Sequence, residues 1–188
     1  MQFRSINWHL DCVAMRKANT SFVTDRIYAV NRSGLSFSLI EEAHQPPLKK
    51  DYDFSITEER VNSALATVAA SEEGRLCGFA VVIEEEWNRR AVITDFFVDR
   101  QARRLGLGRS MLQIIFEQLI GKPHRILWVE TQNVNFPAIT FYRSAGFEVC
   151  GFDSTLYDGA LSKEVAVFLS KRLECRQEEA EQDSGGNG

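Results

Sequence analysis

Residues 89–131 most constrain the fold, because they place a strand, a glycine-containing loop, a helix and a second strand in succession. The run RRAVITDFFV predicts the first strand, and the short apolar run RILWVET is typical of a buried parallel strand. The helix between them is predicted from apolar residues at helical spacing, which are Leu112, Ile115, Phe116 and Leu119. Gly121 and Pro123 then end it. Two strands joined by a helix form a right-handed crossover, so the sheet must contain a parallel pair.

The segments on either side predict further strands and short helices. FVTDRIYAV and LSFSLIEEA predict a hairpin at about residues 23–31 and 35–43, and Pro46 and Pro47 predict a loop after it. Other strands are expected at about residues 65–71 and 75–86 and in the runs FEVCGFD and EVAVFLSK. Short helices are expected in SITEERVNSALAT and at about residues 136–145. We therefore expect an α+β fold with a mixed central sheet flanked by helices.

Length and composition favour a single domain. A chain of 188 residues with 44% hydrophobic and 26% charged side chains is ordinary for a globular protein. We expect the domain to span residues 1–174 and the acidic, glycine-ended residues 175–188 to be disordered. The four cysteines are scattered and the three histidines lack metal-ligand spacing, so neither a disulfide framework nor a metal is expected.

Charge and targeting signals limit the classes of partner. A net charge of −4, with aromatic residues that are not interleaved with basic ones, argues against nucleic-acid binding. The sequence shows no signal peptide and no apolar run long enough to span a membrane. The expected location is therefore the cytoplasm.

The loop RQARRLGLG, between the strand and the helix, has the composition of an anion-binding site. Its glycines allow a tight turn with uncovered amides, and the following helix directs free N–H groups and a positive dipole end at it. A Walker-type loop would need a lysine that is missing, and a Rossmann fingerprint would need glycine where Met111 stands. The pattern that remains is Arg-x-x-Gly-x-Gly, formed by Arg103, Gly106 and Gly108. A plain strand-to-helix turn with solvated arginines is the alternative.

A second motif follows one helix and one strand later, in ETQNVNFPAITFYRSAGFEV. It contains an asparagine followed by Ala-Ile, Phe-Tyr and Gly-Phe pairs, at Asn135, Ala138, Ile139, Phe141, Tyr142, Gly146 and Phe147. Together the two motifs resemble those of the Gcn5-related N-acetyltransferase (GNAT) family, over about residues 65–170. The resemblance implies a fold in which two parallel strands, here residues 91–98 and 125–131, splay apart. It also implies acetyl-CoA as the co-substrate.

The resemblance further implies which residues bind acetyl-CoA. Backbone groups near Phe97 and Val98 would pair with the pantetheine arm. Asn135 would contact the same arm, although its position also suits a helix N-cap. The pyrophosphate would lie on the loop residues Arg103, Arg104, Leu105, Gly106, Leu107, Gly108 and Arg109. Tyr142 would lie near the sulfur.

Three residues are candidates for the proton transfers. Tyr142 would protonate or hydrogen-bond the CoA thiolate, and its alternative role is packing in the core. Glu130, at the end of the second splayed strand, would take the proton of the acceptor amine, unless it only holds the substrate. Asp95, on the first splayed strand, is the other candidate base, and its alternative is a salt bridge to a neighbouring strand.

Further stretches resemble the streptothricin acetyltransferase branch of the family, which acetylates a lysine-like arm of a polycationic antibiotic. They are SFVTDRIY, KKDY, EEEWNRRAVITDFFV and the run from Trp128 to Gly159. In this branch the hairpin is expected where many relatives carry two helices. The implied acceptor is a small cationic amine, and candidate contacts to it are Asp153, Tyr157 and Asp158.

Two other functions remain open from the sequence. One is acetylation of protein N-termini or lysines, which the spacing of Glu130 and Tyr142 suits. The other is a non-catalytic module that binds acyl-CoA. The sequence also leaves the oligomeric state open, a homodimer included.

Overall fold

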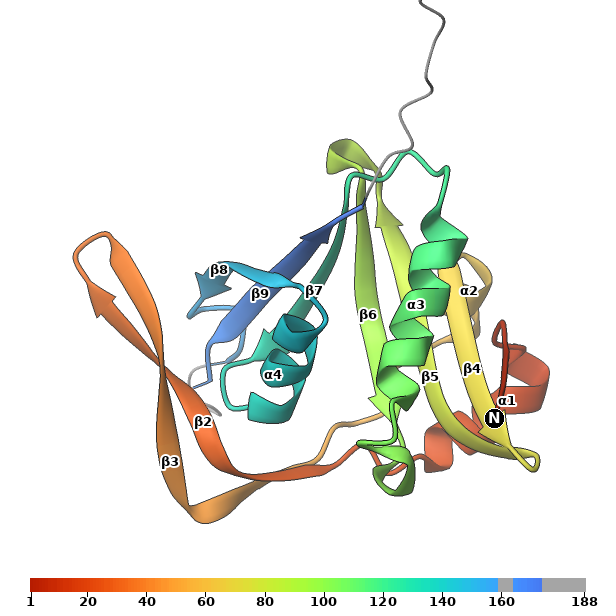
Figure 1. The fold of residues 1–188 in the computed structure, drawn as a ribbon, viewed down its shortest axis with the longest axis horizontal. Helices are drawn as coiled ribbons and strands as arrows, with labels where there is room; N and C mark the ends of the chain where they lie inside the picture. The colour runs from red at the N-terminus through yellow and green to blue at the C-terminus, as the bar shows by residue number, and fades with distance from the viewer. Residues whose placement is uncertain (159–163, 174–188) are drawn as a thin grey trace, which may run out of the picture.

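A seven-stranded sheet forms the body of the protein, in the order β1-β4-β5-β6-β7-β9-β8 (Figure 1). The computed structural model describes residues 1–158 and 164–173, so the tail expected at 175–188 lies outside the described residues. The strands are β1 (Gln2–Arg4), β4 (Ala66–Glu72), β5 (Arg75–Glu85), β6 (Arg90–Val98), β7 (Ile126–Gln132), β8 (Glu148–Asp153) and β9 (Ala166–Arg172). In the described part of the chain, β6 and β7 are parallel and the other neighbours antiparallel, so the sheet is mixed as expected.

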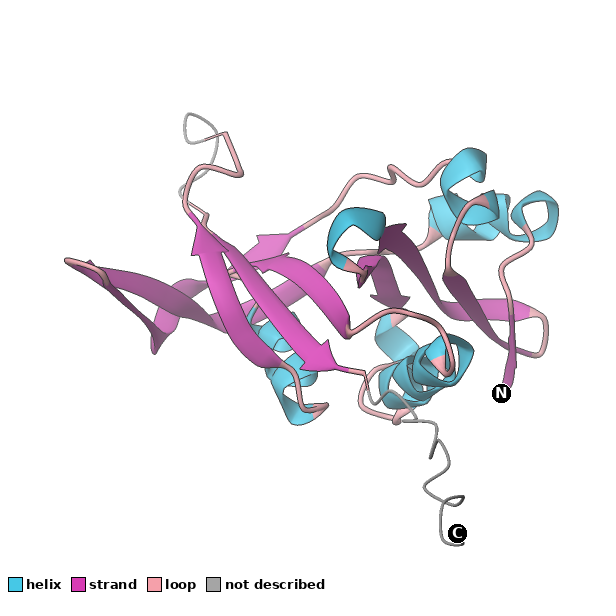
Figure 2. Ribbon diagram, turned by 90° about the horizontal axis from the view of Figure 1, so that it is seen from above, coloured by secondary structure: helices cyan, strands magenta, loops and turns pink. Residues whose placement is uncertain are grey.

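Helices cover both faces of the sheet (Figure 2). The helices α3 (Leu107–Leu119) and α4 (Phe136–Ser144) pack on one face, whereas α1 (Trp8–Lys17) and α2 (Glu58–Asn62) pack on the other. Two short 3-10 turns, η1 (Glu86–Asn88) and η2 (Arg100–Ala102), precede and follow β6.

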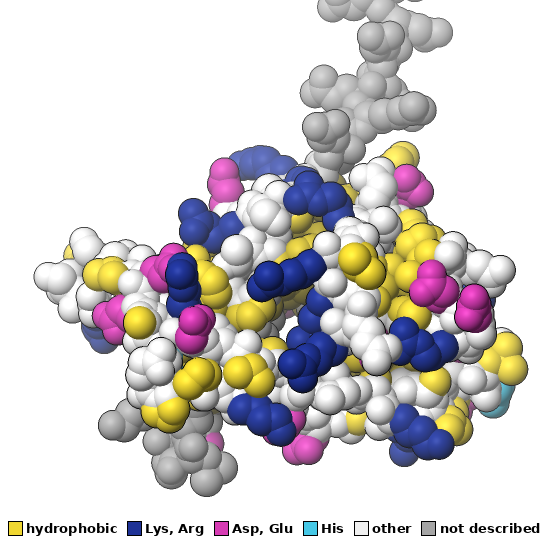
Figure 3. Space-filling model, turned by 60° about the horizontal axis from the view of Figure 1, so that its bottom comes forward, with side chains coloured by type: hydrophobic (Ala, Val, Ile, Leu, Met, Phe, Trp, Pro, Cys, Tyr) yellow, Lys and Arg dark blue, Asp and Glu magenta, His cyan; other side chains and the backbone are white. Residues whose placement is uncertain are grey.

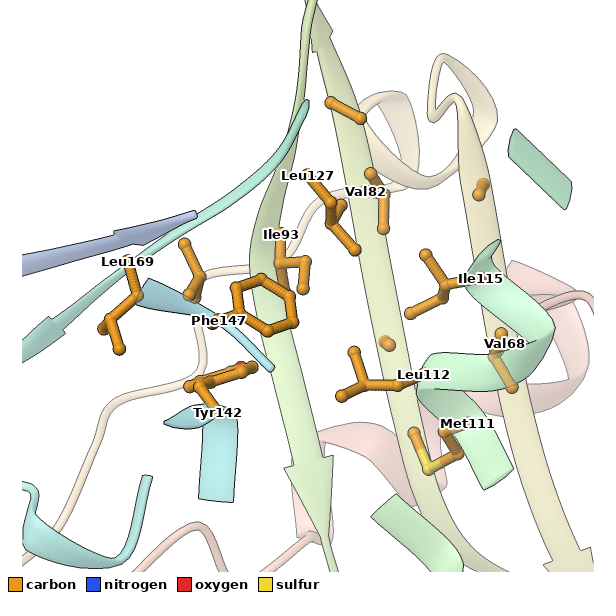
Figure 4. Packing of buried hydrophobic residues seen from close by; sticks show 14 of the residues in the cluster. Val68, Val82, Ile93, Met111, Leu112, Ile115, Leu127, Tyr142, Phe147 and Leu169 are labelled. Atoms are coloured by element: carbon orange, nitrogen blue, oxygen red, sulfur yellow. The ribbon is translucent and has the colours of Figure 1, made fainter. Parts of the chain in front are cut away.

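Each face of the sheet has its own apolar cluster. The larger cluster fills the space between the sheet and α3 and α4 (Figure 4). Leu112, Ile115 and Leu119 of α3 are buried in it, and Phe116 packs at its edge, which confirms the predicted apolar stripe. The smaller cluster joins Met15 of α1 to the opposite face.

The hairpin of β2 (Phe22–Ser33) and β3 (Ser36–Lys50) projects from the body as a separate two-stranded sheet (Figure 1). It is longer than predicted, and the loop predicted at Pro46 and Pro47 is wrong. The register shifts between Thr24 and Arg26, so residues 44–47 have no partner in β2. Proline is compatible with such a place because it has no N–H to donate to a ladder.

The N-terminal segment also differs from expectation, because the hairpin does not replace two helices. Instead α1, which the sequence analysis does not predict, precedes the hairpin. The helix α2 follows it, in the stretch SITEERVNSALAT where a short helix is expected. Of the residues in α1 only Asp11 and Met15 are buried, so its sequence carries little apolar periodicity. Strand β1 is equally hard to predict, since its residues are exposed and it forms only by pairing with β4.

Candidate active site

Strands β6 and β7 separate partway along their length, and the candidate site lies where they part (Figure 1). They pair only where Arg90–Ile93 faces Ile126–Val129. Beyond this point, residues 95–98 still pair with β5 and residues 130–132 with β9. The two facing edges therefore keep backbone N–H and C=O groups for an inserted ligand, as expected of splayed parallel strands.

A cleft of about 1310 Å³ occupies this gap. Its walls come from β6, the loop after it, the start of α3, β7 and α4, and also from β2 and the chain that follows the hairpin. Both signs of charge line it: the arginines are Arg26, Arg103, Arg104 and Arg109, and the acids are Asp25, Asp53, Asp95 and Glu130. Figure 3, which brings the lower side of the molecule forward, shows several Lys and Arg side chains near the middle of that face.

The loop after β6 presents free amides to the cleft. Gly106 is the N-cap of α3 and adopts φ 84°, a left-handed conformation that glycine reaches without a steric penalty. The first helical hydrogen bond runs from the Ser110 N–H to the Gly106 carbonyl at 3.0 Å. The three preceding amides, from Leu107 to Arg109, thus have no partner within the helix and form an anion site at its positive end.

The predicted phosphate-binding side chains are placed differently from one another. Arg104 and Arg109 line the cleft with exposed side chains, whereas Leu105 is 78% exposed and does not line it. The Arg103 guanidinium is already engaged, since it donates to the carbonyls of Val98 at 2.9 Å and Ser21 at 3.0 Å. Its burial lowers the pKa of Arg103. Arg103 therefore ties the loop to the chain that enters the hairpin.

Packing against Phe141 also favours glycine at position 108, which the sequence alone does not reveal. A Cβ at this position would lie 3.1 Å from both Cε2 and Cζ of Phe141. The Phe141 ring packs beside Phe96, with 5.5 Å between ring centroids. Glycine at 108 thus lets α4 approach the start of α3 across the cleft.

A β-bulge brings the two candidate bases to one face of the sheet. Opposite β5, Val82 pairs with Ile93 and Val81 with Asp95, so Thr94 is the extra residue. Ile93 belongs to the cluster under α3, and the extra residue turns Asp95 to the opposite face. Glu130 lies on that same face, because its neighbours on β7 alternate with it and face α3 and α4.

The Asp95 carboxylate has partners on the α2 side. The Thr94 hydroxyl donates to it at 2.8 Å, and an Arg60 nitrogen lies 3.6 Å away. The salt bridge considered from the sequence thus exists, but it reaches helix α2 and not a neighbouring strand. Burial raises the pKa of Asp95, against the opposing effects of Thr94 and Arg60.

The Glu130 carboxylate has a neutral partner. It accepts a hydrogen bond from the Tyr157 hydroxyl at Oε1. Burial raises the pKa of Glu130, and the tyrosine opposes this effect. Of the other predicted substrate contacts, Asp153 accepts from the backbone N–H and hydroxyl of Thr155 at 2.7 Å each, so it holds a local turn.

Tyr142 is both a core and a cleft residue. Its ring is 4% exposed and packs 5.3 Å from the Phe147 ring, in the cluster drawn in Figure 4. It also lines the cleft, and its hydroxyl forms no hydrogen bond with another described residue. Burial raises the pKa of Tyr142 well above its usual value, so the phenol stays protonated. Phe97 and Val98 line the same cleft from β6.

Sequence reasoning missed a tyrosine and a glutamine beside Asn135. The Asn135 Oδ1 caps α4 by accepting from the Ala138 N–H at 3.2 Å, as considered from the sequence. Its Nδ2 donates to the Tyr52 hydroxyl at 3.1 Å, and that hydroxyl donates to Gln132. Gln132 lies two residues after Glu130 and so shares its face, which is the one signal that could have identified it.

Two classes of feature are missing from the described ranges. None of the helices within residues 1–158 and 164–173 has the length and apolar character that a bilayer span requires. In the same ranges no three His, Cys, Asp or Glu side chains gather where they could hold a metal ion.

Known proteins share this architecture along most of the chain. Streptothricin acetyltransferase of Streptomyces lavendulae is 37% identical over 170 residues, which cover 85% of this chain and 89% of that protein. The crystal structure of nourseothricin acetyltransferase superposes with a TM-score of 0.82 and 34% identity, covering 92% of this chain and 98% of the other. A Bacillus anthracis protein in complex with acetyl coenzyme A gives a TM-score of 0.78 and 25% identity, covering 91% and 98%.

The family itself is matched over the crossover and both glycine-containing motifs. The model of the acetyltransferase (GNAT) family aligns with residues 32–147, which include β6, the anion loop, β7 and α4. With these matches added to the splayed strands and the free amides of the loop, the chain belongs to the acetyltransferase (GNAT) family and is an acetyl-CoA-dependent acetyltransferase.

Proposed function

We propose that the acceptor is a primary amine on a flexible arm of a small polycation of the streptothricin type. The observation that carries this proposal is the pair of partly buried carboxyl groups, Asp95 and Glu130, close to the point where β6 and β7 part. Carboxylates there would attract and orient a cationic acceptor. The similarity to streptothricin acetyltransferase extends over 85% of the chain, which supports the same class of acceptor.

Glu130 is the proposed general base. An ammonium group has an ordinary pKa near 10 and must lose its proton before it can attack. A carboxyl group whose pKa is raised by burial is a stronger proton acceptor, and Glu130 has no cationic partner among the described residues that would offset this. Asp95 already faces Arg60 at 3.6 Å, so we assign it the role of holding the acceptor.

Tyr142 is the proposed proton donor to the leaving sulfur. Its phenol is held neutral by burial, and its hydroxyl is not engaged with another described residue. A neutral, unengaged hydroxyl at the cleft wall can donate a hydrogen bond or a proton to a developing thiolate.

Acetyl-CoA, when bound, supplies an acetyl group that is activated as a thioester. The residues present fit such a ligand, because the free amides of Leu107–Arg109 suit a pyrophosphate and the unpaired edge at Phe97 and Val98 suits an amide-containing arm. Arg104 and Arg109 would add charge at the phosphates. Arg103 is assigned a positioning role, because its donors are already used on backbone carbonyls.

The acceptor is tested by measuring thiol release from acetyl-CoA with three kinds of amine: streptothricin, free lysine and peptides with free N-termini. We expect streptothricin to react much faster than the other two, with a rate that falls at high salt because opposite charges steer the encounter. A Glu130→Gln variant gives the background release. Faster turnover of peptides would identify a protein acetyltransferase instead. Tight CoA binding without turnover of any of the three amines would refute the proposed acceptor class.

A further inference from the structure

Tyr157 contacts the candidate base from outside the cleft. It lies on residues 154–158, which follow β8, and its hydroxyl donates to Glu130 Oε1. Tyr157 does not itself line the cleft, whereas Glu130 does. The tyrosine therefore holds one oxygen of a carboxyl group that lines the cleft, without lining the cleft itself.

The contact leaves half of the carboxyl group available. Glu130 Oε2 forms no hydrogen bond with another described residue, so it remains free to meet an amine or a water in the cleft. A carboxylate on a three-torsion side chain has several orientations, and a hydrogen bond on one oxygen selects among them. A donor on the ionised form also stabilises that form.

The other polar and charged groups around Glu130 have partners of their own. From the chain after the hairpin comes Tyr52, whose hydroxyl is bonded to Gln132 and Asn135. Beside β9 stands Glu164, which pairs with Lys50 of β3 at 2.7 Å.

Across the cleft, Asp95 of β6 is paired with Arg60 of α2. Among the described residues, Tyr157 donates the hydrogen bond that the Glu130 carboxyl group accepts.

We propose that Tyr157 is a positioning residue for acetyl transfer, which holds one carboxyl oxygen of Glu130 so that Oε2 is presented to the acceptor amine. The proposal rests on the proposed role of Glu130 as the general base. Tyr157 itself carries no proton in the reaction. It acts through Glu130 and touches neither substrate.

The first test reads the carboxyl group directly and needs no acceptor. The 13C resonance of the Glu130 side chain is followed from acidic to neutral pH in the wild type and in Tyr157→Phe, and it is assigned by its loss in Glu130→Gln. Without the donor, the Glu130 pKa should rise by about one unit, since a hydrogen bond to a charged group is worth that order of effect. An unchanged titration in a folded Tyr157→Phe protein overturns the proposal.

A matched control removes another tyrosine hydroxyl. Tyr28 lies on β2, stacks on Phe136, and its hydroxyl makes no hydrogen bond within the described residues. Tyr28→Phe should leave the Glu130 titration where it is. An equal shift in this control would assign the effect to general loosening of the fold and overturn the specific role.

The second test uses kinetics and separates this inference from the role of Glu130. In Tyr157→Phe the acidic limb of kcat/KM should move to higher pH by the same amount as the titration, with the affinity for CoA unchanged. In a Glu130→Gln background the substitution should change kcat/KM less than about twofold, as coupled residues require. A shifted titration with an unmoved rate profile would keep the contact but remove Glu130 as the base, which is a failure of the proposed function.

Discussion

Substitution of Gly108 by valine tests the anion loop and its contact with α4 at once. The added Cβ would lie 3.1 Å from two ring carbons of Phe141, while carbon atoms pack best at about 3.5–4.0 Å. The ring must therefore retreat by about half an ångström for the Cβ alone, and further for the two methyl groups. Its path is limited by Phe96, 5.5 Å away between centroids, and by Tyr142, 5.2 Å away.

The expected losses follow from this crowding. Overpacking a filled site lowers stability by about 1–3 kcal/mol. Replacing glycine in the first turn of a helix restores roughly a few tenths of a kcal/mol, because valine has the better helix propensity. The free energy of unfolding should thus fall by about 0.5–2.5 kcal/mol. The valine also covers the amides of α3, so CoA affinity should fall at least tenfold, which corresponds to about 1.4 kcal/mol. Pantetheine, which lacks the pyrophosphate, should be affected much less.

Calorimetry with CoA and with pantetheine measures both affinities, and circular dichroism confirms the fold. Gly151→Val is a matched control, because a Cβ there would lie 3.3 Å from the Phe168 ring, away from the cleft. It should lower stability and leave CoA affinity intact. If relief of the crowding by Phe141→Leu restores CoA binding to Gly108→Val, the ring shift is the cause. Unchanged CoA affinity in a folded Gly108→Val protein would refute the loop assignment.

Three further outcomes are expected at the catalytic groups. Tyr142→Phe should lower kcat by about 10²-fold and leave both KM values within a few-fold, as steady-state kinetics would show; wild-type turnover would make Tyr142 a packing residue. The activity of the wild type should be lost as pH falls through the raised pKa of Glu130, and Glu130→Gln should abolish that acidic limb in a pH–rate profile. Asp95→Asn should raise the acceptor KM about tenfold without moving the profile, and a moved limb would transfer the base role to Asp95.

The features that the sequence predicted are those with a local signal. The apolar stripe of α3 repeats within a few turns, and the loop before it is marked by Gly106 and Gly108, so helix, loop and crossover could all be placed. The parallel strands were expected to splay because of the resemblance that the two motifs carry. Glu130 at the end of β7 and Asn135 at the start of α4 line the cleft, because they lie on elements that the two motifs place.

The features that escaped prediction depend on partners distant in the sequence. Arg103 has the residue type and the loop position of a phosphate ligand. Its guanidinium, however, donates to the carbonyl of Ser21, 82 residues earlier in the chain. Tyr52 and Tyr157 meet β7 from segments on either side of it in the chain. The prolines in β3 predict a loop from sequence alone, because the register shift that accommodates them exists only once β2 is paired.

The bulge at Thr94 shows why a strand pattern alone cannot assign the carboxylates. In a regular strand every second residue shares a face, so Asp95 would follow Ile93 into the cluster under α3. An ionised side chain packed among the apolar and aromatic side chains there would lose part of its hydration, at a cost of several kcal/mol. With one extra residue, Asp95 instead meets Arg60, and Phe96 takes the place beside Phe141 and Tyr142. The bulge at Thr94 therefore has two effects on the site. It places Phe96 in the aromatic wall of the cleft, and it brings Asp95 to the face of the sheet that carries Glu130, so that β6 supplies both residues.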